Sequence, residues 1–301
     1  MKCTRCKAPA VVALPSHHAG FCPDCFKDFF TRQVEKGIRR HQLFTHDDTI
    51  LVAISGGKDS LALMLELARL EYRVTGLHID LAIPNSSEAA RATVEAFCAK
   101  HGLDLIIKDM AREGLAIPDV KKRLNRPICS ACGKIKRYYF NKTALEGGFT
   151  VLATGHNLDD EIARLFSNVL RWDAAYLADQ GPVLPAAGGF ARKVKPFWRL
   201  TEFETANYAF LQGIDYHTAP CPYSKGASFT MHKRLWADLE EEMPGRKLDF
   251  YQGFLQQGRL HFAPTRAKED ELLAPCATCG YPTSAGTCGV CRIKIALADG
   301  E

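Results

Sequence analysis

The sequence lacks any run of about 18 consecutive apolar residues, the length at which a helix can cross a bilayer. The opening stretch, MKCTRCKAPAVV, also lacks the apolar segment of a secretory signal. Charge of one sign is not in large excess, because 39 lysines and arginines face 34 acidic residues for a net charge of +5. Such a balance permits nucleic acid as a partner but does not require it. We therefore expect a cytoplasmic protein without a membrane partner.

Cysteine, by contrast, is abundant, with 12 residues in a chain of 301. In a reducing compartment this number favours metal binding over a disulfide framework. Eight of them form two sets of paired C-x-x-C turns, namely Cys3, Cys6, Cys22 and Cys25, and Cys276, Cys279, Cys288 and Cys291. Two such turns close a tetrahedron around Zn²⁺ and leave no open coordination position. We predict two structural zinc modules, each of which either faces nucleic acid or only stabilises the fold.

Three further cysteines, Cys129, Cys132 and Cys221, are the wrong number for a closed structural zinc site. Three thiolates suit a [4Fe–4S] cluster whose fourth iron stays open to an outside ligand. They also suit a redox pair with a resolving cysteine, in which one thiol carries a persulfide. Both alternatives indicate sulfur chemistry. The twelfth cysteine, Cys98, falls on the apolar face of an expected helix and is interpreted as a core residue.

From residue 49 onward, short apolar runs alternate with helical patterns. Strands are expected over 49–54, 74–79, 103–109 and 150–155, with an edge-like strand over 192–197, and helices over 58–70, 87–100, 134–146, 158–170 and 201–211. This alternation predicts an α/β fold with a doubly wound parallel sheet. The expected domains are a zinc finger over 1–26, a connecting helix over 27–48, a catalytic domain over 49–265 and a second zinc finger over 266–301.

The stretch SGGKDS, from Ser55 to Ser60, follows the first expected strand and opens a helix. It lacks the G-x-x-x-x-G-K-[ST] spacing of the common nucleotide kinases and GTPases. Gly56 and Gly57 still let backbone N–H groups approach an anion at the helix N-terminus, and Lys58 adds positive charge. Asp59 fits this setting if it holds Mg²⁺ or orients the loop. Because ligands bind beyond the carboxyl ends of parallel strands, SGGKDS, HID (78–80) and TGHNLDD (154–160) should converge on one site.

SGGKDS in this position resembles the PP-loop of the N-type ATP pyrophosphatases, which cleave ATP between its α- and β-phosphates and adenylate a carbonyl oxygen. The chain also resembles the tRNA 2-thiouridine synthetases over nearly its whole length. This resemblance rests on the two zinc modules and on the motifs CSACG-x2-KRY (129–138), ATGHNLDDE (153–161), QGPVLP (180–185), VKPF (194–197) and CP-x2-KGA (221–227). Within the TtcA/TtuA family, one C-x-x-C pair plus a lone cysteine resembles the TtuA type, which acts on 5-methyluridine 54, or the wobble-uridine type. The cytidine-32 type usually has two such pairs.

The resemblance implies a reaction and the residues that perform it. ATP with Mg²⁺ would adenylate the C2 oxygen of a tRNA uridine, and sulfide on a [4Fe–4S] cluster held by the three central cysteines would replace that oxygen to give 2-thiouridine. The implied catalytic residues are Asp59, Lys136 and Asp160. The implied nucleotide-binding residues are Ala53, Ser55, Gly56, Gly57, Lys58, Asp59, Ser60, Ile79, Lys136, Arg137 and Gly155.

The partners that the resemblance implies are tRNA, a ubiquitin-like carrier protein that brings sulfur as a thiocarboxylate, and a second copy of the chain in a homodimer. Alternatives stay open at this point. One keeps ATP but replaces the cluster with a persulfide on Cys129 or Cys132 that Cys221 resolves. Another is a zinc-knuckle RNA-binding protein with a vestigial PP-loop. A sulfur-free adenylation, such as amidation, is disfavoured because it gives the three central cysteines no role.

Overall fold

The computed structural model describes residues 1–301 except 125–126, 224–227, 263–272 and 299–301. Two features of the sequence prediction therefore lie outside the described residues. One is the boundary at 265 and 266 between the expected catalytic domain and the C-terminal zinc finger. The other is the last part of the motif over 221–227.

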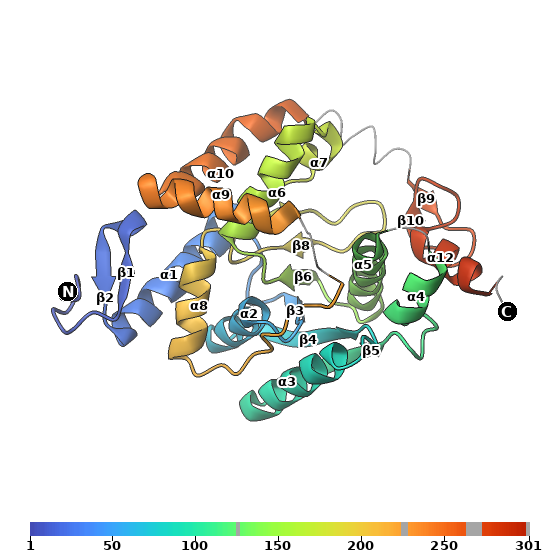
Figure 1. Ribbon diagram of the computed structural model, residues 1–301, viewed down its shortest axis with the longest axis horizontal. Helices are drawn as coiled ribbons and strands as arrows, with labels where there is room; N and C mark the ends of the chain where they lie inside the picture. The colour runs from blue at the N-terminus through green and yellow to red at the C-terminus, as the bar shows by residue number, and fades with distance from the viewer. Residues whose placement is uncertain (125–126, 224–227, 263–272, 299–301) are drawn as a thin grey trace.

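A six-stranded sheet forms the centre of the molecule (Figure 1). In spatial order its strands are β5 (Asp104–Asp109), β4 (Arg73–Asp80), β3 (Thr49–Ala53), β6 (Val151–Thr154), β8 (Lys193–Val194) and β7 (Val183–Leu184). The first five run parallel, and β7 pairs antiparallel with β8. The doubly wound sheet is thus confirmed. The expected edge strand over 192–197 is much shorter and is not the edge, because Pro196 has no N–H to extend the ladder and β7 covers its outer side.

Alternate residues of the central strands supply two separate cores. Ile50 and Val52 of β3 pack with α1 (Pro23–His41), α2 (Lys58–Arg69), α3 (Ser86–His101) and α8 (Glu202–Leu211). Leu51 packs with α4 (Ile117–Arg123), α5 (Ile128–Glu146) and α12 (Gly289–Ala298) on the opposite face. This division follows from the two-residue period of a strand. Cys98 on α3 is buried in the first core, as predicted.

A third core lies beside the sheet, around the buried side chain of Trp198. It contains residues of α6 (Leu158–Arg171), α7 (Ala174–Ala178), α9 (Ser228–Glu242), α10 (Arg246–Gln256) and the 3-10 helix η2 (Gly258–Phe262). Helix α6 begins with a capping box made by Asn157 and Asp160, and α8 begins with the predicted one, made by Thr201 and Glu204. These caps fix where both helices start beside the ends of the central strands.

The two terminal cysteine modules lie at opposite ends of the long axis of the molecule (Figure 1). The first consists of β1 (Val12–Leu14), the 3-10 helix η1 (Pro15–His17) and β2 (Ala19–Phe21), and it leads directly into α1. The second consists of β9 (Ala274–Pro275), β10 (Pro282–Thr283) and α12. No helix in the described part of the chain is long and apolar enough to span a membrane.

Candidate active site and metal centres

The stretch Ser55–Ser60 joins the carboxyl end of β3 to the first turn of α2. Gly56 has a φ of +84°, a conformation that favours glycine, and a Cβ there would crowd the carbonyl oxygen of Ala90 at 3.1 Å. The Ser60 hydroxyl accepts from the N–H of Ser55 (3.1 Å) and donates to the carbonyl oxygen of Gly57 (2.9 Å). The loop is therefore closed on itself, with the first N–H groups of α2 available to an anion.

Gly155 lets the segment after β6 approach this loop closely. A Cβ on Gly155 would lie 2.9 Å from the carbonyl group of Asp59 and from the backbone nitrogen of Ser60. The amide of Asn157 donates to Oδ1 of Asp59 across the same gap (3.2 Å). The ends of β3 and β6 therefore meet at one place, where crossovers to the two sides of the sheet diverge.

A chain of ion pairs links the loop to α8 and α9. Nζ of Lys58 lies 3.0 Å from Oδ2 of Asp59 and 2.8 Å from Oε1 of Glu202. Nζ of Lys233 lies 2.9 Å from Oε2 of Glu202 and 2.6 Å from Oδ1 of Asp160. Burial opposes ionisation of Glu202, but hydrogen bonds from both lysines outweigh it and lower its pKa to about 2. Two cations thus hold three carboxylates together beside the loop.

The pKa values of Asp160 and His156, at the start of α6, are shifted in opposite directions. Burial raises the pKa of Asp160, although Lys233 opposes that shift, so this carboxylate depends on its lysine for its charge. His156 shares a hydrogen bond of 2.8 Å with the hydroxyl of Thr154. Burial, together with nearby cations that include Lys193, lowers the pKa of His156 well below its usual value. The imidazole is therefore neutral at neutral pH.

A cavity of about 360 Å³ opens beside the loop. Its walls bring together four predicted nucleotide-binding positions, namely Ala53, Ser55, Gly57 and Ile79, with the predicted catalytic residue Lys136. The side chains of Cys132 and Cys221 line the same cavity. One space thus adjoins both the anion-binding loop and two of the three central cysteines.

Two buried imidazole nitrogens on the wall of this cavity, Nε2 of His78 and Nε2 of His217, have no hydrogen-bond partner among the described residues. Nδ1 of His78 hydrogen-bonds the carbonyl oxygen of Ile54 (3.0 Å), and burial lowers its pKa. The backbone N–H of His217 donates to the carbonyl oxygen of Gly56 (2.9 Å). Orphaned polar atoms on a cavity wall fit a ligand that carries polar groups of its own, such as a nucleotide.

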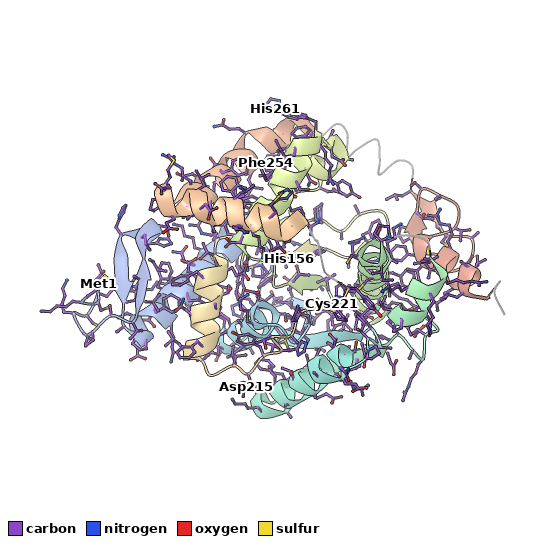
Figure 2. All side chains as sticks on the ribbon, in the orientation of Figure 1. Met1, His156, Asp215, Cys221, Phe254 and His261 are labelled. Atoms are coloured by element: carbon purple, nitrogen blue, oxygen red, sulfur yellow. The ribbon has the colours of Figure 1, made fainter. Side chains whose placement is uncertain are left out.

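The central cysteines approach the cavity from two segments. Cys129 and Cys132 are the second and fifth residues of α5, which begins at Ile128 and not at the predicted Lys134. Cys221 follows α8 and lies in the middle of the molecule, where Figure 2 also places His156. Burial raises the pKa of the Cys132 thiol, and the neighbouring thiols add to the shift.

The spacing of the three central sulfurs differs from that of the terminal sets. Among the described residues, the terminal sets alone bring their sulfurs within 4.8 Å of one another. Cys129 donates to the carbonyl oxygen of Tyr223 (3.6 Å). Three thiols at this wider spacing, two of them on the cavity wall, suit a cluster of several metal ions better than a single ion.

Each terminal set has the compact geometry that one tetrahedral ion requires. Backbone N–H groups, with that of Cys6 first, lower the pKa of Cys3 to about 6. In the second set, the backbone N–H of Cys288 lies 3.2 Å from Sγ of Cys276 and is the main cause that lowers its pKa to about 6. Zinc binds the thiolate, so both sets fit Zn²⁺.

Lys136 and Arg137 are adjacent in the chain but line different cavities. Lys136 faces the cavity beside the PP-loop, whereas Arg137 lines a second cavity together with Phe190 and Tyr281. Successive helical residues point about 100° apart, so α5 cannot turn both side chains to the same space. The structure therefore does not bring Arg137 to the other predicted nucleotide-binding residues.

Glu202, Lys233 and His217 were not identified from the sequence. A signal for Glu202 was present, because it is the first residue of the helix that the capping box over 201–204 predicted. Lys233 and His217 carry no local signal. Their position in the site depends on how α9 and the segment before Cys221 return to the sheet.

Comparison with known protein families assigns two regions of the chain. Residues 28–220 match the family described as PP-loop domain, and residues 2–27 match the N-terminal LIM domain of the 2-thiouridine synthetase TtuA.

Relatives match over nearly the full length. The chain is 42% identical to the tRNA-5-methyluridine(54) 2-sulfurtransferase of Thermus thermophilus, a match that covers 97% of this chain and 91% of the relative. Its identity to the protein of the same name from Pyrococcus horikoshii is 41%, over 97% and 93% of the two chains. Among solved structures, the U34-tRNA thiolase NcsA from Methanococcus maripaludis with its [4Fe–4S] cluster aligns with a TM-score of 0.79 at 25% identity, over 99% of this chain and 96% of that chain.

Proposed function

This chain belongs to the TtuA family of PP-loop tRNA 2-sulfurtransferases, and from that premise we propose the reaction that it catalyses. ATP adenylates the C2 oxygen of a tRNA uridine, and sulfur then replaces that oxygen to give 2-thiouridine. Position 54 is the proposed target, because the Thermus and Pyrococcus relatives, at 42% and 41% identity, are named for it. The solved relative is named for U34, so wobble uridine 34 is the second candidate.

The observation that supports this reaction most is the shared cavity. Activation and sulfur transfer must act in succession on one carbonyl group of the target base, the first on its oxygen and the second on C2, from which AMP then leaves. The cavity beside the PP-loop is lined by Ser55 and Gly57 on one side and by Cys132 and Cys221 on the other. A base held in this cavity lies next to the phosphate-binding loop and next to two of the cysteines, so both steps can occur without its release.

Adenylation is needed because the C2 oxygen of uracil is a poor leaving group, whereas AMP is a good one. In the proposed reaction the N–H groups of Ser55–Ser60 and the ammonium of Lys58 hold the triphosphate. Asp59 and Asp160 hold Mg²⁺, with proton transfer as the alternative role of Asp160. Lys136 neutralises the charge that develops on the α-phosphate or polarises the C2 carbonyl group.

Cys129, Cys132 and Cys221 fit a [4Fe–4S] cluster by their number and spacing, and a relative of the same fold is named with such a cluster. When bound, the cluster supplies an iron with an open position at which sulfide is delivered. The chain itself holds this position at the cavity that receives the uridine. Helix α5 carries Cys129 and Cys132, and the hydrogen bond from His217 to Gly56 holds the segment that leads to Cys221.

The remaining parts of the proposal rest on the family. Zinc modules over 1–26 and 266–301 each hold one Zn²⁺, and a linker helix over 27–48 joins the first to a catalytic domain over 49–265. Sulfur arrives as the thiocarboxylate of a ubiquitin-like carrier protein. The enzyme works in the cytoplasm as a homodimer.

The test is reconstitution with anaerobically purified protein. Iron, acid-labile sulfide and zinc are measured, and the protein is incubated with ATP, a sulfide donor and tRNA, whose nucleosides are then mapped by mass spectrometry. We expect about four irons and about two zinc ions per chain, and 2-thiouridine at position 54. A tRNA with cytidine at 54 is the matched control.

Three outcomes would contradict parts of this proposal. Full activity without iron would replace the cluster with the persulfide route. Product at position 34 would change the target. Binding of tRNA without ATP consumption or product would favour the RNA-binding alternative.

A further inference from the structure

A second cavity, of about 270 Å³, adjoins the cavity beside the PP-loop, and the ring of Phe140 lines both. It lies between α5, the strands β7 and β8, and the loop of the C-terminal zinc module that carries Tyr281. Among the described residues, its lining includes no PP-loop residue and no cysteine. The reaction proposed above therefore gives this cavity no role.

Aromatic rings form much of its wall. Phe140 comes from α5, Phe190 from the connection between β7 and β8, and Tyr281 from the zinc module. The rings of Phe190 and Tyr281 meet nearly edge to face, with centroids 5.7 Å apart. The ring of Tyr138 also packs against Tyr281, with a centroid distance of 4.7 Å. The volume is below the roughly 300 Å³ at which small-molecule sites usually begin. Fixed rings around so small a space fit a single flat heteroaromatic ring.

Lys193, which has no ion-pair partner among the described residues, lines the same space. Lys195, two residues along the chain, is paired with Glu161 (2.7 Å), whereas no carboxylate of the described residues lies within ion-pair distance of Lys193. Asp179 also lines the cavity. Burial, with neighbouring cations, lowers the pKa of Lys193 to about 8, so the group still carries charge at neutral pH. A charged group in such surroundings favours an anionic ligand.

We propose that this cavity binds one base of the tRNA other than the target uridine, turned out of its stack and packed against the wall that Phe190 and Tyr281 form, with an adjacent phosphate at Lys193. The inference rests on the tRNA thiolation proposed above. The target itself must lie in the cavity beside the PP-loop, because its C2 atom has to reach both the nucleotide and the sulfur. Since Phe140 separates the two spaces by one ring, the second base is a near neighbour of the target in the RNA chain.

Holding a neighbouring base solves a physical problem of this reaction. A uridine removed from its stack returns to it unless its unstacking cost is offset by new contacts. A second base that stacks on protein rings resists that return and fixes where the target lies along the chain. The site therefore determines which uridine is presented as well as how tightly the tRNA binds.

The test is a double-mutant cycle between protein and RNA. Phe190→Ala removes a ring from the wall, and Phe190→Leu keeps apolar bulk without a ring. Their tRNA affinities are measured against tRNAs that carry a single abasic nucleotide at each position around the target. Loss of one stacked base should weaken binding about tenfold, and ATP affinity should stay unchanged. At one abasic position the two losses should not add, because the same contact is already missing.

Lys193 is tested by two replacements. Lys193→Met should weaken tRNA binding several-fold and reduce its salt dependence by about one phosphate contact. Lys193→Arg keeps the charge and should bind close to wild type. Equal tRNA affinity and equal salt dependence in Lys193→Met and wild type would overturn the phosphate contact.

The outcomes separate this inference from the proposed function. A wild-type protein that binds tRNA but makes no 2-thiouridine overturns the function. A wild-type protein that thiolates tRNA, while the losses from the Phe190 variants and the abasic sites add at every position, overturns the cavity inference alone. Melting curves identify a variant that fails to fold. If Phe190→Ala does so, the tRNA affinities of Phe190→Leu and Lys193→Met test the inference instead.

Discussion

Replacing Lys233 with methionine should destabilise the fold and change the pH dependence of thiolation. Methionine keeps an unbranched apolar stem but removes the ammonium that lies 2.6 Å from Asp160 and 2.9 Å from Glu202. The side chains of Lys233 and Asp160 are 24% and 18% exposed, so water screens the pair only in part. Losing one partner of a fully buried pair costs about 3–5 kcal/mol, and the partial exposure here reduces the expectation to roughly 2 kcal/mol of unfolding free energy.

The sign of the pH effect follows from Asp160. Burial already raises the pKa of this carboxyl, and Lys233 is the main group that opposes the shift, so its pKa rises further in the variant. A carboxyl with a raised folded pKa contributes stability below its unfolded pKa and loses that contribution as pH rises through the folded value. The penalty of Lys233→Met should therefore be larger at about pH 8 than at about pH 5.

The same change is visible in the rate. Because loss of Lys233 removes the main group that holds the pKa of Asp160 down, the acidic limb of the rate profile should move to higher pH in Lys233→Met. The assays are initial rates of 2-thiouridine formation across pH and urea unfolding at both pH values. Lys233→Arg keeps the charge and is the matched control. Superimposable acidic limbs for wild type and a folded Lys233→Met protein would refute the role of ionised Asp160, and equal unfolding penalties at both pH values would refute an electrostatic cause.

Three further predictions concern the loop, its carboxylate and the second zinc module. Gly155→Ala places a Cβ 2.9 Å from the backbone of Asp59 and Ser60, so the affinity for ATP in equilibrium binding should fall at least about tenfold. An ATP affinity equal to that of the wild type would show that the loop accommodates the methyl group without losing its shape. Asp59→Asn keeps the shape of the side chain and removes its charge, so thiolation should fall about a hundredfold while tRNA binding persists, and undiminished thiolation would contradict an enzymatic role for this carboxylate. Cys279→Ser removes one ligand of the second zinc set, so metal analysis should show the loss of about one zinc ion per chain, and tRNA affinity should fall because Tyr281 follows in the same loop; an unchanged zinc content would count against a four-cysteine site.

The fold was predictable wherever a strand and its helix are neighbours in the sequence. Ile50, Leu51 and Val52 read as a strand buried on both faces, and the structure buries all three. The start of α5 was not predictable in the same way, because Ser130 and Gly133 resemble turn residues. Pro127 in fact immediately precedes the helix, so the C-x-x-C pair lies at its start.

The part of the site that lies at the carboxyl ends of strands was predictable from the sequence. Ser55–Ser60 and Gly155 follow β3 and β6, so their motifs were visible in the sequence. Lys233 reaches the ion pairs beside the PP-loop, and Tyr281 reaches the second cavity, from segments that return from far along the chain. No local sequence pattern indicates such a return. Arg137 was predicted to bind nucleotide but lines the other cavity. A sequence motif gives the order of residues but not the helical face on which each one lies.

The hydrogen bond from the N–H of His217 to the carbonyl oxygen of Gly56 (2.9 Å) joins two parts of the site that lie far apart in the sequence. Gly56 belongs to the loop that the proposed reaction assigns to the triphosphate, and His217 lies four residues before Cys221. A substitution that displaces this short segment is therefore expected to disturb the loop and the thiol together. In the proposed reaction, activation of the uridine and delivery of sulfur would thus share one backbone contact.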